Sequence, residues 1–486
     1  MGTALSASSS VDRWRPTLPT PIFVLGAIAC GLGVGSILSS SSSDLPIVTL
    51  VCLPIQIGLF LFLSRYVMRR GLALSVWIGF AWIVYFTVRM VFTQADRGNL
   101  NENSLVRAAG DDAFVWAWIV TTLGLAAFVL GVAISDGRRP STRSVPDFNT
   151  KTLLGFATIG LLGRYAMVFG GIASGFIENI MSLYLLAFGA LGYHAVTNPS
   201  VRRPLYTLVG LASMVGIVTS FKEAAIIPIA ALAIGMAAAG FKVGGKRVAL
   251  MVGFGFFVFL TVQGNRVAFD EGESVPIYMG AISAFTDYDL ESGVRADPDR
   301  GLNDAVVDTM QGMSRRFGGV TSIIVVYERV PNDVEFLGGK SLWQPAASSV
   351  PMLPAHLDLE FQVLSMGRYF TTTFIAVDQE ENASSQAITM LGDLYLNFGN
   401  VGVVLGMLAW GIAIGRLDKL VSPTSATRVG ALVYLGHILI GVERNVAYLF
   451  VNGAIRVMVL LLVFRAVARW GQRETSASRL VHAGAA

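Results

Sequence analysis

The chain alternates long apolar runs with short polar segments, and the runs have the length of membrane-spanning helices. All but the run at 428–442, which is slightly shorter, hold roughly 17 to 22 mostly apolar residues, about what a helix needs to cross the hydrocarbon core of a bilayer. We mark twelve runs in the sequence, at 20–38, 46–64, 71–92, 113–134, 152–170, 180–197, 204–220, 224–240, 247–263, 394–415, 428–442 and 450–468. The pattern predicts an all-α polytopic membrane protein with about twelve transmembrane helices.

One long hydrophilic interval, residues 264–390, interrupts this pattern. It carries 18 Asp and Glu against 8 Lys and Arg. Within it, residues 303–330 place apolar side chains at helical spacing before Pro331, which predicts one or two helices. Residues 343–354 alternate apolar residues with proline, which predicts an extended segment. The expected organisation is a tail (1–19), transmembrane helices 1–9 (20–263), one large loop (264–390), transmembrane helices 10–12 (391–468) and a second tail (469–486).

The distribution of basic residues predicts the orientation. If the N-terminus is cytoplasmic, every segment on the inner side contains Lys or Arg, as the positive-inside rule requires. These residues are Arg13, Arg15, Arg65, Arg69, Arg70, Arg138, Arg139, Arg143, Lys151, Arg202, Arg203, Lys242, Lys246, Arg247, Arg416, Lys419, Arg428, Arg465, Arg469, Arg473 and Arg479. Both termini are then cytoplasmic and the 264–390 loop is outside.

Composition agrees with this interpretation. The chain is 53% hydrophobic and only 14% charged, whereas soluble domains have about 25% charged residues. The basic pI of about 9.1 is explained by the inner segments and does not require a nucleic-acid partner. The first 19 residues are polar and serine-rich, which is typical of a tail and not of a cleaved signal peptide. Cys30 and Cys52 lie in apolar runs and predict neither a metal site nor a disulfide.

Several ionisable side chains lie within or at the outer ends of the predicted spans. Such groups cost several kcal/mol in lipid unless they face a polar cavity or a partner. They are Arg89, Arg164, Lys222, Glu223, Arg266, Arg444 and Arg456. Each cation could instead extend its head to the lipid headgroups. However, the loop adds Arg315, Arg316 and Arg368 on the same side, where the positive-inside rule predicts few cations.

A group of arginines at a membrane surface suits a diphosphate ligand. The guanidinium fork matches phosphate oxygens, so several forks can hold a diphosphate without a metal ion. If the diphosphate is a leaving group, the same forks stabilise the charge that develops on it. A carboxylate or imidazole would accept a proton from an attacking hydroxyl, and the candidates are His356, Asp358, Glu360, Asp393, Glu223 and Glu443. His437 is more typical of a packed helix residue, and His194 and His482 are on the inner side.

Three local patterns resemble those of bacterial oligosaccharide repeat-unit polymerases, the O-antigen polymerase or Wzy-type family. Arg315-Arg316-Phe317 lies in the helical part of the loop. Gly338-Gly339-Lys340-Ser341 leads to Val350-Pro351 and Leu353-Pro354. Residues 391–402, LGDLYLNFGNVG, resemble the family's segment at the start of the following span. Asp393 stands where the family usually has glutamate, and His356 and Asp358 occupy the region where a Lys-Pro pair often follows.

The resemblance implies an inverted GT-C-like arrangement and a metal-independent glycosyltransferase without a cofactor. Such an enzyme transfers a growing glycan from its polyprenyl diphosphate to a new lipid-linked repeat unit, outside the cytoplasm. Its implied location is the bacterial inner membrane, and its implied partners are the lipid-linked oligosaccharide, the bilayer, a chain-length regulator and a flippase, but no nucleic acid. The expected diphosphate-binding residues are Arg164, Lys222, Arg266, Arg315, Arg316, Arg368 and Arg444. The expected proton acceptor is one of His356, Asp393, Glu223 and Glu443.

Three other functions fit parts of the sequence. An O-antigen ligase would use the same chemistry and differ only in its acceptor. A flippase for lipid-linked oligosaccharides would also carry arginines, but it would not need a large outer loop. A scaffold subunit would not depend on the outer arginines for glycan length.

Overall fold

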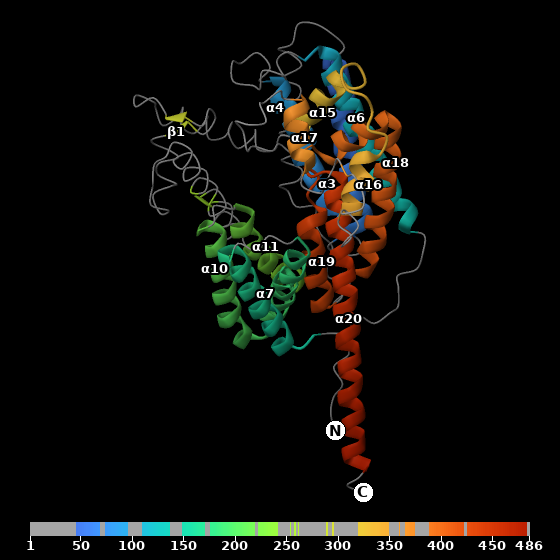
Figure 1. The fold of residues 1–486 in the computed structure, drawn as a ribbon. Coiled ribbons are helices and arrows are strands. Elements are labelled where there is room, and N and C mark those ends of the chain that lie inside the picture. Colours follow the sequence, from blue (N-terminus) through green and yellow to red (C-terminus); the bar gives the residue numbers. More distant parts are fainter. Residues whose placement is uncertain are drawn as a thin grey trace.

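The computed structural model of the chain is predominantly helical in the part that it describes (Figure 1). The described residues are 45–68, 73–95, 109–136, 148–170, 175–218, 222–241, 319–348, 365–374, 388–421 and 425–483, together with 253, 257–258, 261, 288–289, 294–295 and 359.

The elements follow the apolar runs of the sequence. They are α2 (Leu45–Met68), α3 (Leu74–Trp82), the π-helix η2 (Ile83–Val88), α4 (Arg89–Ala95), α6 (Asp111–Asp136), α7 (Thr150–Gly170), α8 (Gly175–Met181), α9 (Leu183–Thr197), the 3₁₀ turn η3 (Pro199–Val201), α10 (Arg202–Val218), α11 (Lys222–Ala238), β1 (Tyr288–Asp289), β2 (Val294–Arg295), α15 (Gly319–Arg329), α16 (Lys340–Ser348), α17 (Ser365–Phe374), α18 (Met390–Leu420), α19 (Ala426–Leu439) and α20 (Val446–Ala483). The two strands form a single antiparallel pair in which Tyr288 faces Arg295.

Six candidate membrane spans are present among the described residues, as judged by helix length and apolar composition. They are Ile47–Arg65, Leu74–Gln94, Asp111–Ser135, Ile177–Thr197, Met390–Leu420 and Val446–Val467. Shorter apolar helices cover Ala224–Ala238 and Ala426–Leu439, and α7 and α10 coincide with two further predicted runs. The runs at 20–38 and, apart from a few residues, 247–263 lie outside the described residues. The helical membrane-protein character is therefore confirmed, while the count of twelve stays a prediction.

The helices form two groups joined by α19. In one group α6 packs against α2 and α18, and in the other α9 packs against α7 and α11. Helix α19 contacts α3 in the first group and both α9 and α11 in the second, and it also contacts α20. Figure 1 shows α7, α10 and α11 together on one side of α19, whereas α6 and α18 lie on the other side.

Glycine permits the closest of these helix contacts. A Cβ added to Gly131 of α6 would lie 2.3 Å from the carbonyl oxygen of Leu408, and one added to Gly411 of α18 would lie 2.2 Å from that of Phe128. No side chain fits at such distances. Because lipid gives apolar helices little reason to associate, backbone approach of this kind is a main source of packing energy in membranes.

Helix α18 is two helices joined by a sharp turn. Phe398 (φ −143°, ψ 15°) and Gly399 (φ 62°, ψ −152°) leave the helical region. In a straight helix, residues 394 and 402 would lie about 12 Å apart along the axis, yet a Cβ on Gly402 would be 2.6 Å from the Leu394 carbonyl oxygen. A Cβ on Gly406 would likewise be 2.4 Å from Leu394 Cδ2. Residues 390–397 therefore fold back along residues 400–406, and we call this unit the α18 hairpin.

The helices of the 264–390 interval pack on one end of the bundle. Helix α15 contacts α6, α17 and α18, and α16 contacts α18 and α20. They lie at the end of the bundle opposite the C-terminal end of α20 (Figure 1). The predicted helix within 303–330 is confirmed for α15, and residues 303–318 lie outside the described part of the chain.

The prediction that 343–354 is extended is wrong for its first residues, because α16 covers Lys340–Ser348. The carbonyl oxygen of Gly339 accepts hydrogen bonds from the backbone N–H groups of Leu342 at 2.9 Å and Trp343 at 3.1 Å, and these bonds start the helix. Pro345 lacks one N–H donor but lies only three residues before the helix ends, so the helix loses a single bond.

Candidate functional site

A buried carboxylate, that of Asp393, joins three separate segments at the loop end of the bundle. Its Oδ1 accepts hydrogen bonds from Ser341 Oγ at 2.5 Å and from Asn397 Nδ2 at 3.1 Å, and its Oδ2 accepts one from the Val446 backbone N–H at 2.9 Å. Asp393 is fully buried. The bond to Val446 occupies an unpaired donor at the start of α20, where negative charge also interacts favourably with the helix dipole.

Asn397, one turn after Asp393, completes this network. Its Nδ2 donates to Ser341 Oγ at 2.6 Å and to the Asp393 carbonyl oxygen at 2.7 Å, and its Oδ1 accepts from the Gly339 backbone N–H at 2.9 Å. The backbone N–H of Leu337 donates to the Leu396 carbonyl oxygen at 3.0 Å. Two sequence motifs, at 338–341 and 391–402, thus form one unit. We call Gly339, Ser341, Asp393, Asn397 and Val446 the Asp393 clasp.

The geometry of the clasp gives Asp393 a structural role. Both carboxylate oxygens are occupied by neutral donors from the protein, and the side chain has no exposed surface. A general base must reach the proton that it abstracts. Nothing in this arrangement supports the predicted role of Asp393 as that base.

A second buried charge, Arg456, lies in the middle of the candidate span Val446–Val467 of α20 and is only 1% exposed. Its Nε donates to Asn179 Oδ1 at 2.8 Å, and its Nη1 donates to the Tyr434 carbonyl oxygen at 2.6 Å. Its guanidinium carbon lies 4.9 Å from the centre of the Tyr434 ring. A guanidinium has five N–H donors, so these two bonds leave donors for a ligand.

Arg164 approaches the same place from α7. Its Nη1 donates to the Tyr184 hydroxyl at 2.8 Å, and its guanidinium carbon lies 5.7 Å from the centre of that ring. Tyr184 is 2% exposed and also interacts electrostatically with Arg456. One tyrosine therefore connects the two arginines.

Arg444 lies in the short connection between α19 and α20. Its guanidinium carbon is 4.6 Å from the centre of the Tyr448 ring, and its Nε is 3.9 Å from Glu443 Oε1. The side chains of Arg444 and Glu443 keep exposed fractions of 31% and 25%. This pair thus forms an accessible rim beside the buried Arg456 and the half-buried Arg164.

His437 shows that the three cations converge. Its imidazole interacts electrostatically with Arg456, Arg444 and Arg164. Its Nδ1 is buried and has no hydrogen-bond partner among the described residues. We call Arg164, Arg444, Arg456 and His437 the arginine cluster.

Neutral groups hold the cluster in place. Asn179 Nδ2 donates to Asn452 Oδ1 at 2.7 Å, the Tyr434 hydroxyl donates to the Asn179 carbonyl oxygen at 2.7 Å, and Asn452 Nδ2 donates to the Tyr448 carbonyl oxygen at 3.0 Å.

The two inner arginines of the cluster are not matched by carboxylates in contact with them. Within the part of the chain that the structure describes, neither Arg164 nor Arg456 forms an ion pair, and Glu178 acts on Arg456 only through a longer-range electrostatic interaction. Because a buried cation without a paired counter-ion is costly, this arrangement favours an anionic ligand.

The structure brings together only some of the predicted site residues. Arg164 and Arg444 meet in the cluster, with Glu443 beside them. Arg368 is exposed on α17, which packs against α15. Lys222 and Glu223 begin α11, but their side chains lie outside the described parts, as do Arg266, Arg315, Arg316, His356, Asp358 and Glu360.

Part of the cluster is not predicted from sequence. The pattern marks Arg456 as an intramembrane cation without placing it in the diphosphate set, and it does not mark Asn179, Tyr184 or Tyr434. The usable signals are the adjacent polar residues Glu178 and Asn179 beside an apolar run, and the four-residue spacing of Asn452 and Arg456, which puts both on one helix face.

A row of aromatic side chains lies at the loop end of α6 and α18. Trp116 and Tyr327 have ring centres 5.3 Å apart, Tyr327 and Tyr395 5.6 Å, and Phe336 and Tyr395 6.3 Å. Burial, with the nearby carboxylates of Asp112 and Glu328, raises the pKa of the Tyr327 phenol. Such aromatic belts mark the interface between membrane and water.

Comparison with known proteins adds no relative: no family model, curated protein or solved structure matches the chain. The fold and the site define a helical protein of the membrane class with a partly buried arginine cluster.

Proposed function

We propose that this protein is a membrane glycan polymerase, which transfers a growing oligosaccharide from polyprenyl diphosphate to a new lipid-linked repeat unit on the extracytoplasmic side. The observation that supports this function best is the arginine cluster. Three cations from distant parts of the sequence interact electrostatically with His437. Arg456 is buried, Arg164 is half-buried and Arg444 is partly exposed, and the first two have no described ion pair. A diphosphate attached to a lipid supplies both the negative charge and the apolar chain that this setting favours.

In the proposed reaction, a hydroxyl oxygen of the acceptor sugar bonds to the anomeric carbon of the donor glycan. The bond between that carbon and the diphosphate oxygen breaks, and the leaving polyprenyl diphosphate takes the electron pair. Arg164 and Arg456 would stabilise the charge on the leaving group, with Arg444 at the rim. The sequence resemblance assigns no role to Arg456; its place here comes from its contacts.

Among the predicted proton acceptors, we assign this role to Glu443. Its carboxylate is partly exposed and lies 3.9 Å from Arg444 Nε, so it is accessible at the edge of the proposed diphosphate site. A carboxylate there could take the proton from the attacking hydroxyl. The Asp393 clasp would position the loop and the start of α20 around this site.

The test is reconstitution of the full chain in liposomes, with one lipid-linked repeat unit as the only substrate. We expect a ladder of lipid-linked products from the wild type and none from Arg164→Ala or Arg444→Ala. The matched control is Arg203→Ala, which should give a normal ladder. Arg203 is an exposed arginine of α10 on the predicted inner side.

Other products would point to the alternatives. Transfer of the glycan only to a different added acceptor would indicate a ligase, and movement of the substrate between leaflets without new bonds would indicate a flippase. Normal ladders from both cluster variants would refute the proposed role of the arginines.

A further inference from the structure

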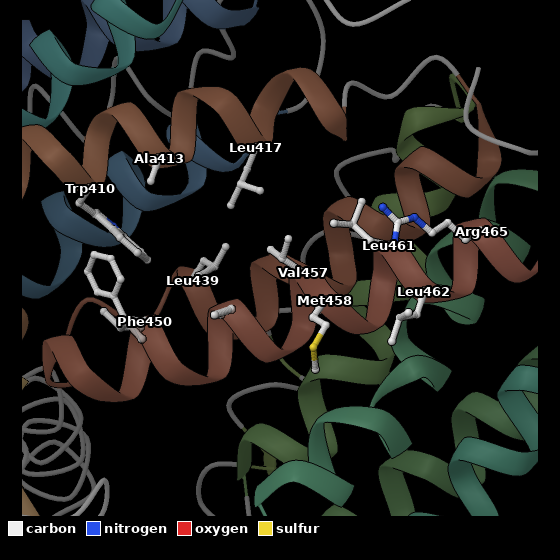
Figure 2. A pocket seen from close by; sticks show the side chains of 13 residues that line it. Trp410, Ala413, Leu417, Leu439, Phe450, Val457, Met458, Leu461, Leu462 and Arg465 are labelled. Carbon is white, nitrogen blue, oxygen red and sulfur yellow. The ribbon is translucent and has the colours of Figure 1, made fainter. Parts of the chain in front are cut away.

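An apolar groove of about 420 Å³ lies between α18, α19 and α20 (Figure 2). Its lining is apolar except for a single cation, Arg465. Gly453 helps to form the floor, where a Cβ would lie 2.9 Å from Leu439 Cδ2, so the glycine allows α19 and α20 to approach closely.

The two ends of the groove differ. At one end the rings of Trp410 and Phe450 pack with centres 5.2 Å apart, and at the other end Arg465 lies near Leu461 (Figure 2). From Phe450 to Arg465 the groove follows α20 for roughly 22 Å, at about 1.5 Å per residue. This length fits one leaflet of a bilayer, counted from the middle of the hydrocarbon core to the headgroups.

The groove uses a different face of α20 from the arginine cluster. Gly453, Val457 and Leu461 recur every fourth residue and line the groove, whereas Asn452 and Arg456 are buried and bond to Tyr448, Asn179 and Tyr434. A ligand in the groove would therefore not occupy the proposed diphosphate site.

Charge indicates which ligand fits the open end. The positive-inside pattern assigns the Arg465 end to the cytoplasmic side. No described residue forms an ion pair with Arg465, and the exposed Arg416 directly precedes Leu417 of the groove lining. Any groove facing lipid holds acyl chains, but the arginine in its lining, Arg465, favours lipids whose headgroups carry net negative charge.

We propose that this groove binds one anionic phospholipid of the cytoplasmic leaflet. One acyl chain lies between α18 and α20 and ends against Trp410 and Phe450, and the phosphate contacts Arg465. The lipid thereby fills the space between the helices that flank α19. This proposal does not depend on the glycan polymerase function.

The test uses the full chain in nanodiscs that contain phosphatidylglycerol and phosphatidylcholine in equal amounts. After gentle removal of bulk lipid, native mass spectrometry counts the lipids that remain bound. We expect one retained phosphatidylglycerol in the wild type and in the control Arg203→Gln. Arg465→Gln should lower this retention roughly fivefold, the effect of one basic side chain on an anionic lipid, and Ala454→Phe should abolish it by filling the groove.

A second measurement locates the lipid. Phosphatidylglycerol with a photoreactive acyl chain should label peptides around Trp410 and Met458, and Ala454→Phe should remove that label. Two results of the first measurement would overturn the proposal: retention of phosphatidylcholine equal to that of phosphatidylglycerol, or unchanged retention of phosphatidylglycerol in Arg465→Gln. Displacement of the bound lipid by added polyprenyl phosphate would also overturn it. So would the absence of label at the groove, which would mean that another segment of the chain covers it.

Discussion

The Asp393 clasp and the arginine cluster are both built around a buried charge, yet their surroundings differ. Every oxygen of the Asp393 carboxylate accepts a hydrogen bond from a neutral donor of the protein. In the cluster, the two inner arginines bond to neutral partners and form no ion pair within the described part of the chain, whereas Arg444 pairs with Glu443 at the rim.

The difference separates a structural centre from a binding centre. A buried charge whose bonding capacity is used by the protein fixes segments to one another, as the clasp fixes the loop to α18 and α20. Buried cations with unused donors have bonding capacity left for a ligand. Four substitutions test whether the two centres differ in this way.

The largest effect should follow from Arg456→Met, which keeps much of the volume of the side chain and removes its charge. Loss of one preorganised donor for a developing anion typically lowers kcat by about 10²–10³. We therefore expect the rate at which the product ladder forms to fall by that factor. The variant also leaves the buried acceptors of Asn179 and Tyr434 without their donor, which should cost about 1–3 kcal/mol in unfolding free energy, so the activity is compared per folded molecule. A normal ladder would show that Arg456 serves only in packing.

The opposite profile is expected for Asp393→Ala. This change leaves the donors of Ser341, Asn397 and Val446 without their acceptor, which should cost about 3 kcal/mol or more in unfolding free energy. Denaturation in detergent would measure it, with Asp393→Asn as the matched variant that keeps one acceptor. Activity per folded molecule should remain close to wild type. Loss of activity without loss of stability would indicate that Asp393 takes part in the chemistry.

A smaller effect should follow from Asn179→Asp, which gives the cluster a counter-ion of nearly unchanged shape. The new carboxylate would pair with Arg456 and compete with the diphosphate, so the substrate KM should rise about tenfold. Thermal stability should change little, because the new ion pair with Arg456 offsets the lost hydrogen bond from Asn179 Nδ2 to Asn452 Oδ1. The control is Asn452→Asp, which neighbours Asn179 but does not bond to Arg456; an equal rise in KM from both variants would contradict the model of competition at Arg456.

The smallest effect is expected for Arg368→Ala. The sequence pattern places this residue among the diphosphate ligands, but it is exposed on α17. If the cluster is the binding site, the ladder should change by less than about twofold, within the range of surface substitutions. A loss of activity as large as that of Arg456→Met would mean that the binding site extends to the helices of the 264–390 interval. The arginine cluster would then not be the whole diphosphate site.

The spans could be predicted from sequence because apolar length alone defines them, and α2, α6 and α20 lie where the apolar runs predict. The α18 hairpin could not be predicted, because hydropathy reports how apolar a segment is and not the direction of its chain. Gly399 carries the turn, but a glycine in an apolar run is equally compatible with a straight helix that packs closely against a neighbour.

The two centres were predictable to different degrees. Asp393 and Ser341 both belong to motifs that stand out in the sequence, but their contact depends on how the loop docks. Arg164 and Arg444 stand out because cations are costly in lipid. Their proximity depends on α7, α9, α19 and α20 packing together, and no periodicity in the sequence reports this packing.

The α18 hairpin has a consequence for how the protein is made. During synthesis, residues 390–420 can enter the membrane as one apolar helix of 31 residues. The reversal at Gly399 then has to form after insertion, and Asn397 beside it bonds to Gly339 and Ser341, which lie 58 and 56 residues earlier in the chain. This end of the bundle is therefore completed only when the segment that contains Gly339 and Ser341 packs against α18.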